Sequence, residues 1–420
     1  MKFFVKNSLL LHGIIWSSAL IVRLSLVSSH GGLQGDELSY HALANSLEEG
    51  KGYGMEGQTY SRPPVYPLFV ASVYRIFGKG NVKAVYVIQA VLGALICNLV
   101  YEMSKRLFGF VPALLSAFLV TVNMPLAASS SRLLSECLFT VFLMGGFFLL
   151  QNPTRKTVIF SGVLLAMAAM TRGIVLYLPF LLGFIFMISG GKEGLQKGGL
   201  LIGAFLVAMI PLTMRNYFVY HAFVPVSTQG GYVFYTSYHP KEGKFFGYNV
   251  KDAVTDSADQ LTSETKRNDY FYRRTVEDIR KNPRGTLRLE ILKFLYFWVP
   301  FDWEILGKGR YHFVYAFVFP MIFLGIFWAK GRRLFLLTPL FYFLGMSLIF
   351  YGSPRFRLPV EPFLMILGAF GLVELFRRLP RRSLGWIFTA TLLTANAGVA
   401  VFQDPLKRVL MHSLHGWGLW

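Results

Sequence analysis

The sequence contains few acidic residues and few cysteines, and these shortages exclude several kinds of site. Its two cysteines, Cys97 and Cys137, lie in separate apolar stretches, so a disulfide framework is not expected. Asp and Glu number 22 against 42 Lys and Arg, which gives a formal net charge of +20. The sequence also lacks a Cys/His metal cluster, a phosphate-binding glycine loop and a nucleophilic serine motif, so the common motifs of metal, nucleotide and serine chemistry are absent.

The basic excess does not indicate a nucleic-acid partner, because of where the charges lie. The chain is 54% hydrophobic and 16% aromatic, with a mean hydropathy of +0.47. Many Lys and Arg residues flank apolar runs of about 20 residues, the length that crosses a bilayer. The sequence therefore predicts an all-α, multi-pass membrane protein in which much of the positive charge sets topology. The remaining cations can attract membrane lipids and phosphate groups.

Apolar length and flanking charge predict about 11 membrane spans. The N-terminus is basic and then apolar, like a signal peptide, but its apolar run is longer than a usual signal core, so we expect it to remain as the first span. The positive-inside rule places the N-terminus in the cytoplasm and the protein in the cytoplasmic (inner) membrane. The spans are expected near residues 8–28, 84–103, 109–128, 133–151, 156–171, 173–189, 199–214, 311–328, 333–351, 360–376 and 384–402.

The whole chain, residues 1–420, is expected to form one membrane-embedded domain with two long extracytoplasmic segments. The first, 29–83, contains an amphipathic helix after Asp36 and a second helix from Pro67 to Gly78 that suits the membrane interface. The second, 215–310, contains a polar helical stretch near 257–282 and another candidate interfacial helix from Leu287 to Trp298.

Asp36 and Glu37 form the most distinctive polar motif, a few residues after the first apolar run. Acidic residues at a helix start can simply favour the helix dipole and cap free N–H groups. A carboxylate held there can also act as a general base toward an acceptor hydroxyl. Glu37 and His41, four residues apart, could hold a divalent metal or could lie on a solvated helix face.

Several cations and polar residues are expected on the same extracytoplasmic side. Arg62 precedes Pro63 and Pro64, so a rigid turn presents a guanidinium that binds phosphate with a planar fork of donors. The alternative is an interfacial arginine that contacts lipid headgroups. Gln229 opens a glycine-containing segment that could form a flexible turn near a ligand. Further candidates for binding phosphate or lining a cavity are Tyr40, Tyr66, Arg132, Glu136, Arg172, Arg215, Asn216, Arg355 and Arg357.

Motifs spread over most of the chain resemble those of a known group, the C-type (GT-C) glycosyltransferase superfamily. The similarity is to its bacterial and archaeal relatives of protein O-mannosyltransferases and lipid A aminoarabinose transferases. It rests on six motifs that follow one another between residues 35 and 372. They are GDELSYHALANSLEEGKGY, SRPPVYPLFVASVYRIFG, SSSRLLSECLFT, MTRG, PLTMRNYFVYHAFVPVSTQGGY and GSPRFRLPVEPFLMILGAFGL.

The resemblance implies a GT-C-like helical bundle that uses a polyprenyl-phosphate-linked sugar outside the membrane. Asp36 occupies the position of the catalytic base, and Arg62 that of the cation that contacts the donor phosphate. Aminoarabinose transferases carry an acid, implicated in metal binding, where this chain has Ser61, so no metal or other cofactor is expected to be obligatory. The expected reaction is a single inverting displacement onto a lipid, glycan or protein acceptor.

Two other functions remain open from the sequence. One is a transporter or flippase for lipid-linked sugars, although the chain shows no inverted repeat and no ionisable residue at mid-span. The other is a non-catalytic subunit that assembles the cell envelope. Turnover of a labelled polyprenyl-phosphate sugar by the purified protein separates all three.

Overall fold

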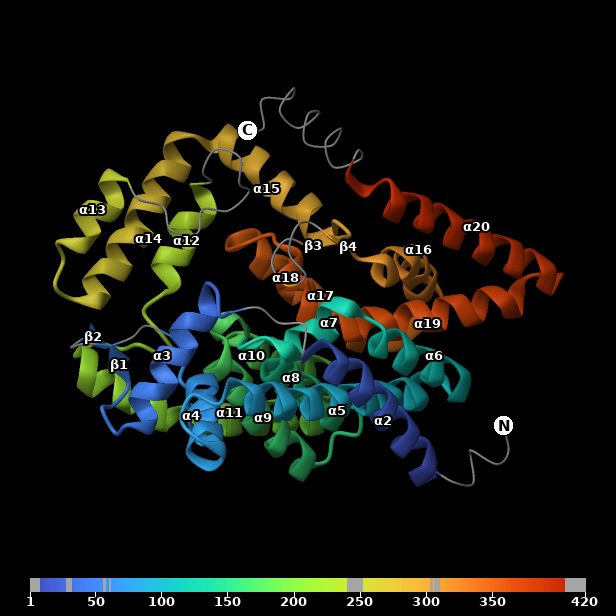
Figure 1. The fold of residues 1–420 in the computed structure, drawn as a ribbon, viewed down its shortest axis with the longest axis horizontal. Coiled ribbons are helices and arrows are strands. Elements are labelled where there is room, and N and C mark those ends of the chain that lie inside the picture. The colour runs from blue at the N-terminus through green and yellow to red at the C-terminus, as the bar shows by residue number, and fades with distance from the viewer. Residues whose placement is uncertain are drawn as a thin grey trace. The chain divides into compact units, whose positions relative to one another are not determined.

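The structure is a computed structural model that describes residues 8–27, 32–55, 58–59, 62–239, 252–302, 305 and 310–404. In this part of the chain nearly every element is a helix (Figure 1). The strands form two short antiparallel pairs, β1 (Gly54–Met55) with β2 (Gln58–Thr59) and β3 (Phe301–Asp302) with β4 (Arg310–Tyr311). The expected all-α fold of a polytopic membrane protein is confirmed.

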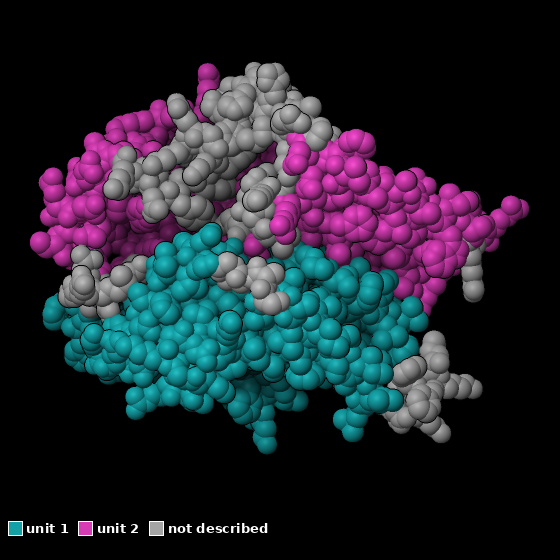
Figure 2. Space-filling view, in the orientation of Figure 1, with its two compact units in different colours: residues 1–227, 334–339, 358–366 teal, residues 228–333, 340–357, 367–420 magenta. Residues whose placement is uncertain are grey.

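The chain divides into two compact units, which Figure 2 colours separately. Unit 1 contains Met1–Ser227, Leu334–Pro339 and Leu358–Ile366. Unit 2 contains Thr228–Arg333, Leu340–Arg357 and Leu367–Trp420. The helices α17 (Arg333–Ile349) and α19 (Glu361–Arg378) therefore contribute residues to both units.

In unit 1, α5 packs against α2, α6 and α8, and α9 packs against α8 and α11, so helices that are apart in the sequence lie side by side. Local capping explains several boundaries: the Asn81 side chain accepts from Ala84 N at the start of α5, and Gly109, with φ of 88°, ends it. The helices are α2 (Ser8–Val27), α5 (Val82–Phe108), α6 (Phe110–Thr121), α7 (Met124–Ala128), α8 (Glu136–Leu150), α9 (Arg155–Thr171), α10 (Leu178–Ser189) and α11 (Gly191–Tyr220), with the short η1 (Ser129–Ser131), η2 (Gly173–Val175) and η4 (Leu358–Val360).

A close approach between α2 and α5 depends on Gly93. A Cβ at this position would lie 2.5 Å from Arg23 Nε and 2.7 Å from Ser130 Oγ. Arg23 is 1% exposed inside the first expected span, and its Nη1 donates to the Ala19 carbonyl over 3.1 Å. The first span thus carries a buried cation, which the sequence analysis did not single out.

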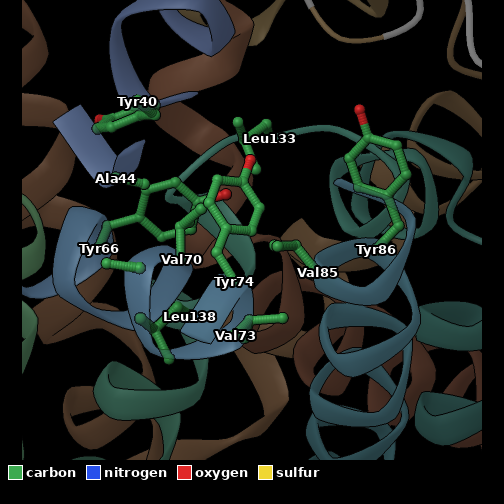
Figure 3. Close-up of a cluster of buried hydrophobic side chains, with 11 residues drawn as sticks. Tyr40, Ala44, Tyr66, Val70, Val73, Tyr74, Val85, Tyr86, Leu133 and Leu138 are labelled. Atoms are coloured by element: carbon green, nitrogen blue, oxygen red, sulfur yellow. The ribbon is translucent and has the colours of Figure 1, made fainter. Parts of the chain in front are cut away.

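The helices α3 (Asp36–Glu48) and α4 (Val65–Phe77) follow the first span, as expected. They pack against each other, and α4 also contacts α5. Figure 3 shows the buried side chains that join them, including Tyr40 and Ala44 from α3 and Tyr66 and Val70 from α4. The apolar face expected of the first helix is confirmed, since Tyr40, Leu43 and Ala44 are buried.

Unit 2 combines amphipathic and apolar helices. The expected turn at Gln229 is wrong, because Gln229 is the N-cap of α12 (Gly230–Tyr238). The stretch near 257–282 is interrupted, with α13 (Ala253–Asp259) ending before α14 (Glu264–Lys281) begins. The remaining helices are α15 (Pro283–Trp298), α16 (Phe313–Trp328), the short η3 (Lys330–Arg332), α18 (Pro354–Arg357) and α20 (Arg382–Val401).

Each expected span corresponds to a helix or to adjoining helical segments. Among the described residues, five helices are long and apolar enough to cross a membrane, or six if α6 and α7, which are bent by 57° at a break, form one span. Five shorter apolar helices of 10–17 residues are also present. The multi-pass architecture is therefore supported by helix length and composition, and the number of 11 spans stays a prediction.

Candidate active site

An ion pair between Asp36 and Arg62 lies at the start of α3. Gly35, with φ of 54°, turns the chain so that Asp36 and Glu37 enter the first helical turn. Arg62 Nη2 donates to Asp36 Oδ1 over 2.7 Å. The Asp36 side chain is 33% exposed and that of Arg62 is 12% exposed. The Asp36 carboxylate is therefore accessible to solvent, while the Arg62 guanidinium is largely enclosed by protein.

Tyr53 links Arg62 to a second cation, Arg215. The Tyr53 hydroxyl donates to the Arg62 carbonyl over 2.7 Å. The Arg215 guanidinium lies 5.4 Å from the Tyr53 ring centroid, and the Arg62 guanidinium lies 4.8 Å from that of Tyr40. Burial, with a smaller contribution from Tyr40, raises the pKa of Tyr53, so its phenol stays neutral and remains a donor. Arg215 of α11 and Arg62 of the first long segment, 153 positions apart, thus meet around one tyrosine.

Glu37 points into the protein, and its side chain is fully buried. It accepts from Gln34 N over 3.1 Å, Arg132 Nη2 over 3.0 Å and Leu133 N over 2.9 Å. These bonds connect the start of α3 to the segment between η1 and α8. The solvated face considered for Glu37 is wrong, and a buried carboxylate held by three donors suits support of the site better than chemistry.

Both ring nitrogens of His41 contact other side chains. Its Nδ1 lies 2.8 Å from the Tyr74 hydroxyl and its Nε2 lies 3.0 Å from Asn45 Nδ2. Burial lowers the pKa of His41 below its ordinary 6.5. Among the residues that the structure describes, no group of three or more His, Cys, Asp or Glu side chains could hold a metal ion. Ser61 lies outside the described residues.

A third ion pair, between Glu136 and Arg172, joins α8 to the end of α9. Arg172 Nη1 donates to Glu136 Oε1 over 2.6 Å and to Ser135 Oγ over 3.3 Å. The Tyr40 hydroxyl donates to the same Ser135 oxygen over 3.3 Å. Tyr40 therefore connects the Asp36–Arg62 pair with the Glu136–Arg172 pair. Its ring lies beside Arg62, and its hydroxyl donates to Ser135, which also accepts from Arg172.

Tyr66 and Gln89 form a buried polar contact behind the two pairs. The Tyr66 hydroxyl donates to Gln89 Oε1 over 2.8 Å, and the rings of Tyr66 and Tyr40 meet edge to face at 4.7 Å. Gln89 Nε2 donates to the carbonyls of Ser130 and Arg132 over 3.1 and 2.8 Å. Gln89 was not identified from the sequence, although an amide inside an apolar span is a recognisable signal.

Asn216 organises the end of α11 beside Arg215. It is 1% exposed, and its Nδ2 donates to the carbonyls of Val224 and Val226 over 2.9 and 3.1 Å. Arg215 Nη1 in turn donates to Asn216 Oδ1 over 3.1 Å. Asn216 therefore closes the turn that follows α11 and orients the neighbouring guanidinium.

Three predicted residues belong to unit 2. Arg357 is 1% exposed, donates from Nη1 to the carbonyls of Phe297 and, over 3.1 Å, Val299, and its guanidinium lies 3.6 Å from the Tyr315 ring centroid. This burial favours a role in holding the end of α15 over phosphate binding. Arg355 is half-buried in α18, where its N–H donates to Ser353 Oγ over 3.2 Å. The third is Gln229, at the start of α12.

Unit 1 thus brings nine of the predicted residues into one polar region beyond the first apolar helix. They are Asp36, Glu37, Tyr40, Arg62, Tyr66, Glu136, Arg172, Arg215 and Asn216. Their arrangement combines an accessible carboxylate, two cations linked by Tyr53 and two buried carboxylates with their own arginines. Such a set can accept a proton at Asp36 while guanidinium groups stabilise a developing negative charge. Together with the helical fold, it defines a polytopic membrane protein with a site suited to phosphate chemistry.

Comparison with known proteins agrees with this class. Residues 61–215 match the family model for dolichyl-phosphate-mannose-protein mannosyltransferase. The archaeal oligosaccharyltransferase AglB from Archaeoglobus fulgidus, in complex with an inhibitory peptide and a dolichol-phosphate, aligns at 13% identity with a TM-score of 0.55 over 95% of this chain and 55% of AglB. Its apo form aligns at 14% identity with a TM-score of 0.54 over 92% of this chain and 56% of that one.

ArnT from Cupriavidus metallidurans, bound to undecaprenyl phosphate, aligns at 13% identity with a TM-score of 0.41 over 87% of this chain and 80% of ArnT. A search of curated proteins finds no match. The chain spans only about half the length of the AglB structures. Residues 61–215 thus resemble a mannosyltransferase family, and the fold of the chain is similar to that of AglB.

Proposed function

We propose that this protein is a membrane glycosyltransferase that transfers a sugar from a polyprenyl-phosphate donor to an acceptor hydroxyl. The observation that carries the proposal is the 2.7 Å contact between Asp36 and Arg62. It pairs a partly exposed carboxylate, able to act as a base, with a guanidinium, able to bind phosphate. The AglB structure with dolichol-phosphate supports a donor of this class.

The proposed reaction is one displacement with inversion at the anomeric carbon. The acceptor oxygen forms a bond to that carbon, the bond from the carbon to the phosphate oxygen breaks, and the acceptor proton moves to Asp36. The lipid phosphate leaves with the bonding electron pair, and Arg62 and Arg215 stabilise its charge. One lost contact of this kind costs about 3–4 kcal/mol in the transition state. No metal is required by these steps.

The existing ion pair makes donor binding and base activation depend on each other. Before the donor binds, Arg62 Nη2 is engaged by Asp36 Oδ1. A donor phosphate that binds Arg62 competes with this contact and releases the carboxylate toward the acceptor. Glu37 keeps α3 in place through Arg132 while Asp36 is released. Glu136 and Arg172 hold Tyr40 through Ser135 on the other side of the same region.

Turnover by the purified protein tests the proposal. The full chain, reconstituted in lipid, is given a radiolabelled polyprenyl-phosphate sugar and a mixture of lipid, glycan and peptide acceptors. A glycosyltransferase releases polyprenyl phosphate and moves the label to one acceptor. Movement of the intact donor across the bilayer without cleavage would instead show a transporter, and neither event would support a non-catalytic subunit.

The side on which the site works is part of the proposal. The charge pattern puts Asp36 and Arg215 on the extracytoplasmic face of the cytoplasmic membrane. Single cysteines at Ser39 and Ser227 should therefore react with an impermeant thiol reagent in intact cells. A cysteine at Thr154 should react only after permeabilisation. Reaction of Ser39→Cys and Thr154→Cys on the same side would reject this topology.

A further inference from the structure

One face of α15 is exposed along its whole length. Arg284, Leu287, Arg288, Ile291 and Leu295 fall at i, i+3, i+4, i+7 and i+11, so they share one side of the helix. All five are exposed, with exposed fractions of 64%, 53% and 55% for the leucine, isoleucine and second leucine. The face is cationic at its beginning and apolar toward its end.

The cationic part continues onto the end of α14. Arg280 and Lys281 close α14, and both are exposed. Among the described residues, none of the four cations Arg280, Lys281, Arg284 and Arg288 has an ion-pair or hydrogen-bond partner. Arg284 also stands in the first turn of α15, where the helix dipole disfavours positive charge, and Arg288 lies one turn further along, where two like charges face each other. Their position therefore does not serve the stability of the helix.

The opposite face of α15 is fixed to the ends of two apolar helices within unit 2. Lys293 is fully buried, and its Nζ donates to the Leu348 carbonyl at the end of α17 over 2.8 Å. Arg357, just before the start of α19, donates to the carbonyls of Phe297 and Val299 at the end of α15. Since helices that cross a bilayer end at its surface, we infer that α15 lies near the boundary between lipid and water.

We propose that this α14–α15 surface, with the cations Arg280, Lys281, Arg284 and Arg288 followed by the apolar residues of α15 described above, binds the headgroups of anionic membrane phospholipids. The four cations meet lipid phosphates, and the apolar residues beyond them enter the acyl region. Charge complementarity selects the lipid, because an apolar face alone would not distinguish anionic from zwitterionic lipid. The surface is separate from the residues that carry the proposed transfer, so neither proposal depends on the other.

The test measures which lipid lies against α15. The full chain carries Leu295→Cys with a fluorophore and is reconstituted in phosphatidylcholine that contains either spin-labelled phosphatidylglycerol or spin-labelled phosphatidylcholine. The native cysteines Cys97 and Cys137 are buried, and protein without the new cysteine checks that they take up no label. We expect at least about fivefold preferential quenching by the anionic lipid, the contribution of one well-placed cation.

Two charge variants make the outcome specific. Arg284→Gln with Arg288→Gln should lower the quenching ratio to the part that Arg280 and Lys281 contribute, and raised salt should lower it in the unmodified chain. The matched control, Lys266→Gln with Arg273→Gln, removes two exposed cations from α14 itself and should leave the ratio unchanged. Both proteins should unfold at temperatures near that of the parent chain. Equal quenching by the two lipids, no quenching by either, or an unchanged ratio in Arg284→Gln/Arg288→Gln would each overturn the proposal.

Discussion

The two adjacent carboxylates at the start of α3 should differ strongly in how much their substitution destabilises the folded protein. Asp36 is partly exposed and pairs with Arg62, whereas Glu37 is fully buried and accepts from Gln34 N, Arg132 and Leu133 N. We therefore predict that Glu37→Ala destabilises the folded protein strongly, and that Asp36→Asn leaves stability almost unchanged.

The magnitudes follow from burial. Glu37→Ala leaves the Arg132 guanidinium, which is 17% exposed, without its described carboxylate, and leaves the buried Leu133 N–H unsatisfied. Removing one partner of such a pair typically costs about 3–5 kcal/mol. Glu37→Gln keeps an acceptor oxygen and should cost less. In Asp36→Asn the amide oxygen can still accept from Arg62, and because the Asp36 side chain is 33% exposed, the loss of its charge should cost about 1 kcal/mol or less.

The native cysteines provide the assay. Cys97 and Cys137 are 0% and 2% exposed, so a thiol-reactive dye reports their exposure on heating. Glu37→Ala should shift the midpoint down by several degrees, Glu37→Gln by less and Asp36→Asn by little. A Glu37→Ala protein as stable as the parent, or an Asp36→Asn protein that unfolds as early as Glu37→Ala, would refute this division of roles.

Three further predictions concern the site. Arg62→Ala should weaken binding of the polyprenyl-phosphate donor and slow transfer, while Arg62→Lys recovers only part because the planar fork is lost; equal donor affinity in all three proteins would point to a headgroup contact instead. Burial lowers the pKa of His41 below 6.5 and so holds its ring neutral in the folded state; the stability of the fold should therefore fall as the pH drops below 6.5. His41→Gln should flatten this pH dependence of the unfolding midpoint, measured by tryptophan fluorescence. An unchanged pH dependence in the variant would contradict this role of His41. Transfer should survive exhaustive chelation, and full loss restored by one divalent ion would contradict this.

The helical architecture could be predicted from the sequence, because the length of the apolar runs and the local residues that end helices largely determine it. The Gly50–Gly52 segment follows α3, and Gly78 caps α4, as their residue types predict. The turn expected at Gln229 failed for a different reason. Gly231 fits closely against α14, since a Cβ there would lie 2.1 Å from the Asn268 carbonyl oxygen, so its glycine serves helix packing and not loop flexibility.

Candidate site residues could be predicted from the sequence where a charged residue stood beside an apolar run. The side chains that these residues contact could not be predicted. Asp36, Arg62 and Arg215 stood out as charges beside apolar runs, but their convergence around Tyr53 depends on tertiary packing. The sequence also could not show which of Asp36 and Glu37 is buried and which is exposed. Adjacent helical residues point about 100° apart, and only tertiary packing decides which side chain faces the interior. Arg357 was predicted to bind phosphate because of its motif, yet it is buried and donates to backbone carbonyls at the end of α15.

The central claim is that Asp36 takes the acceptor proton while the lipid phosphate leaves. It is tested most directly by single-turnover transfer from a radiolabelled polyprenyl-phosphate sugar, measured with the parent chain and Asp36→Asn at saturating donor. We predict that Asp36→Asn stays folded and binds the donor, yet transfers the sugar about 10²–10⁴ times more slowly. A rate close to that of the parent chain would contradict the account and remove Asp36 from the mechanism.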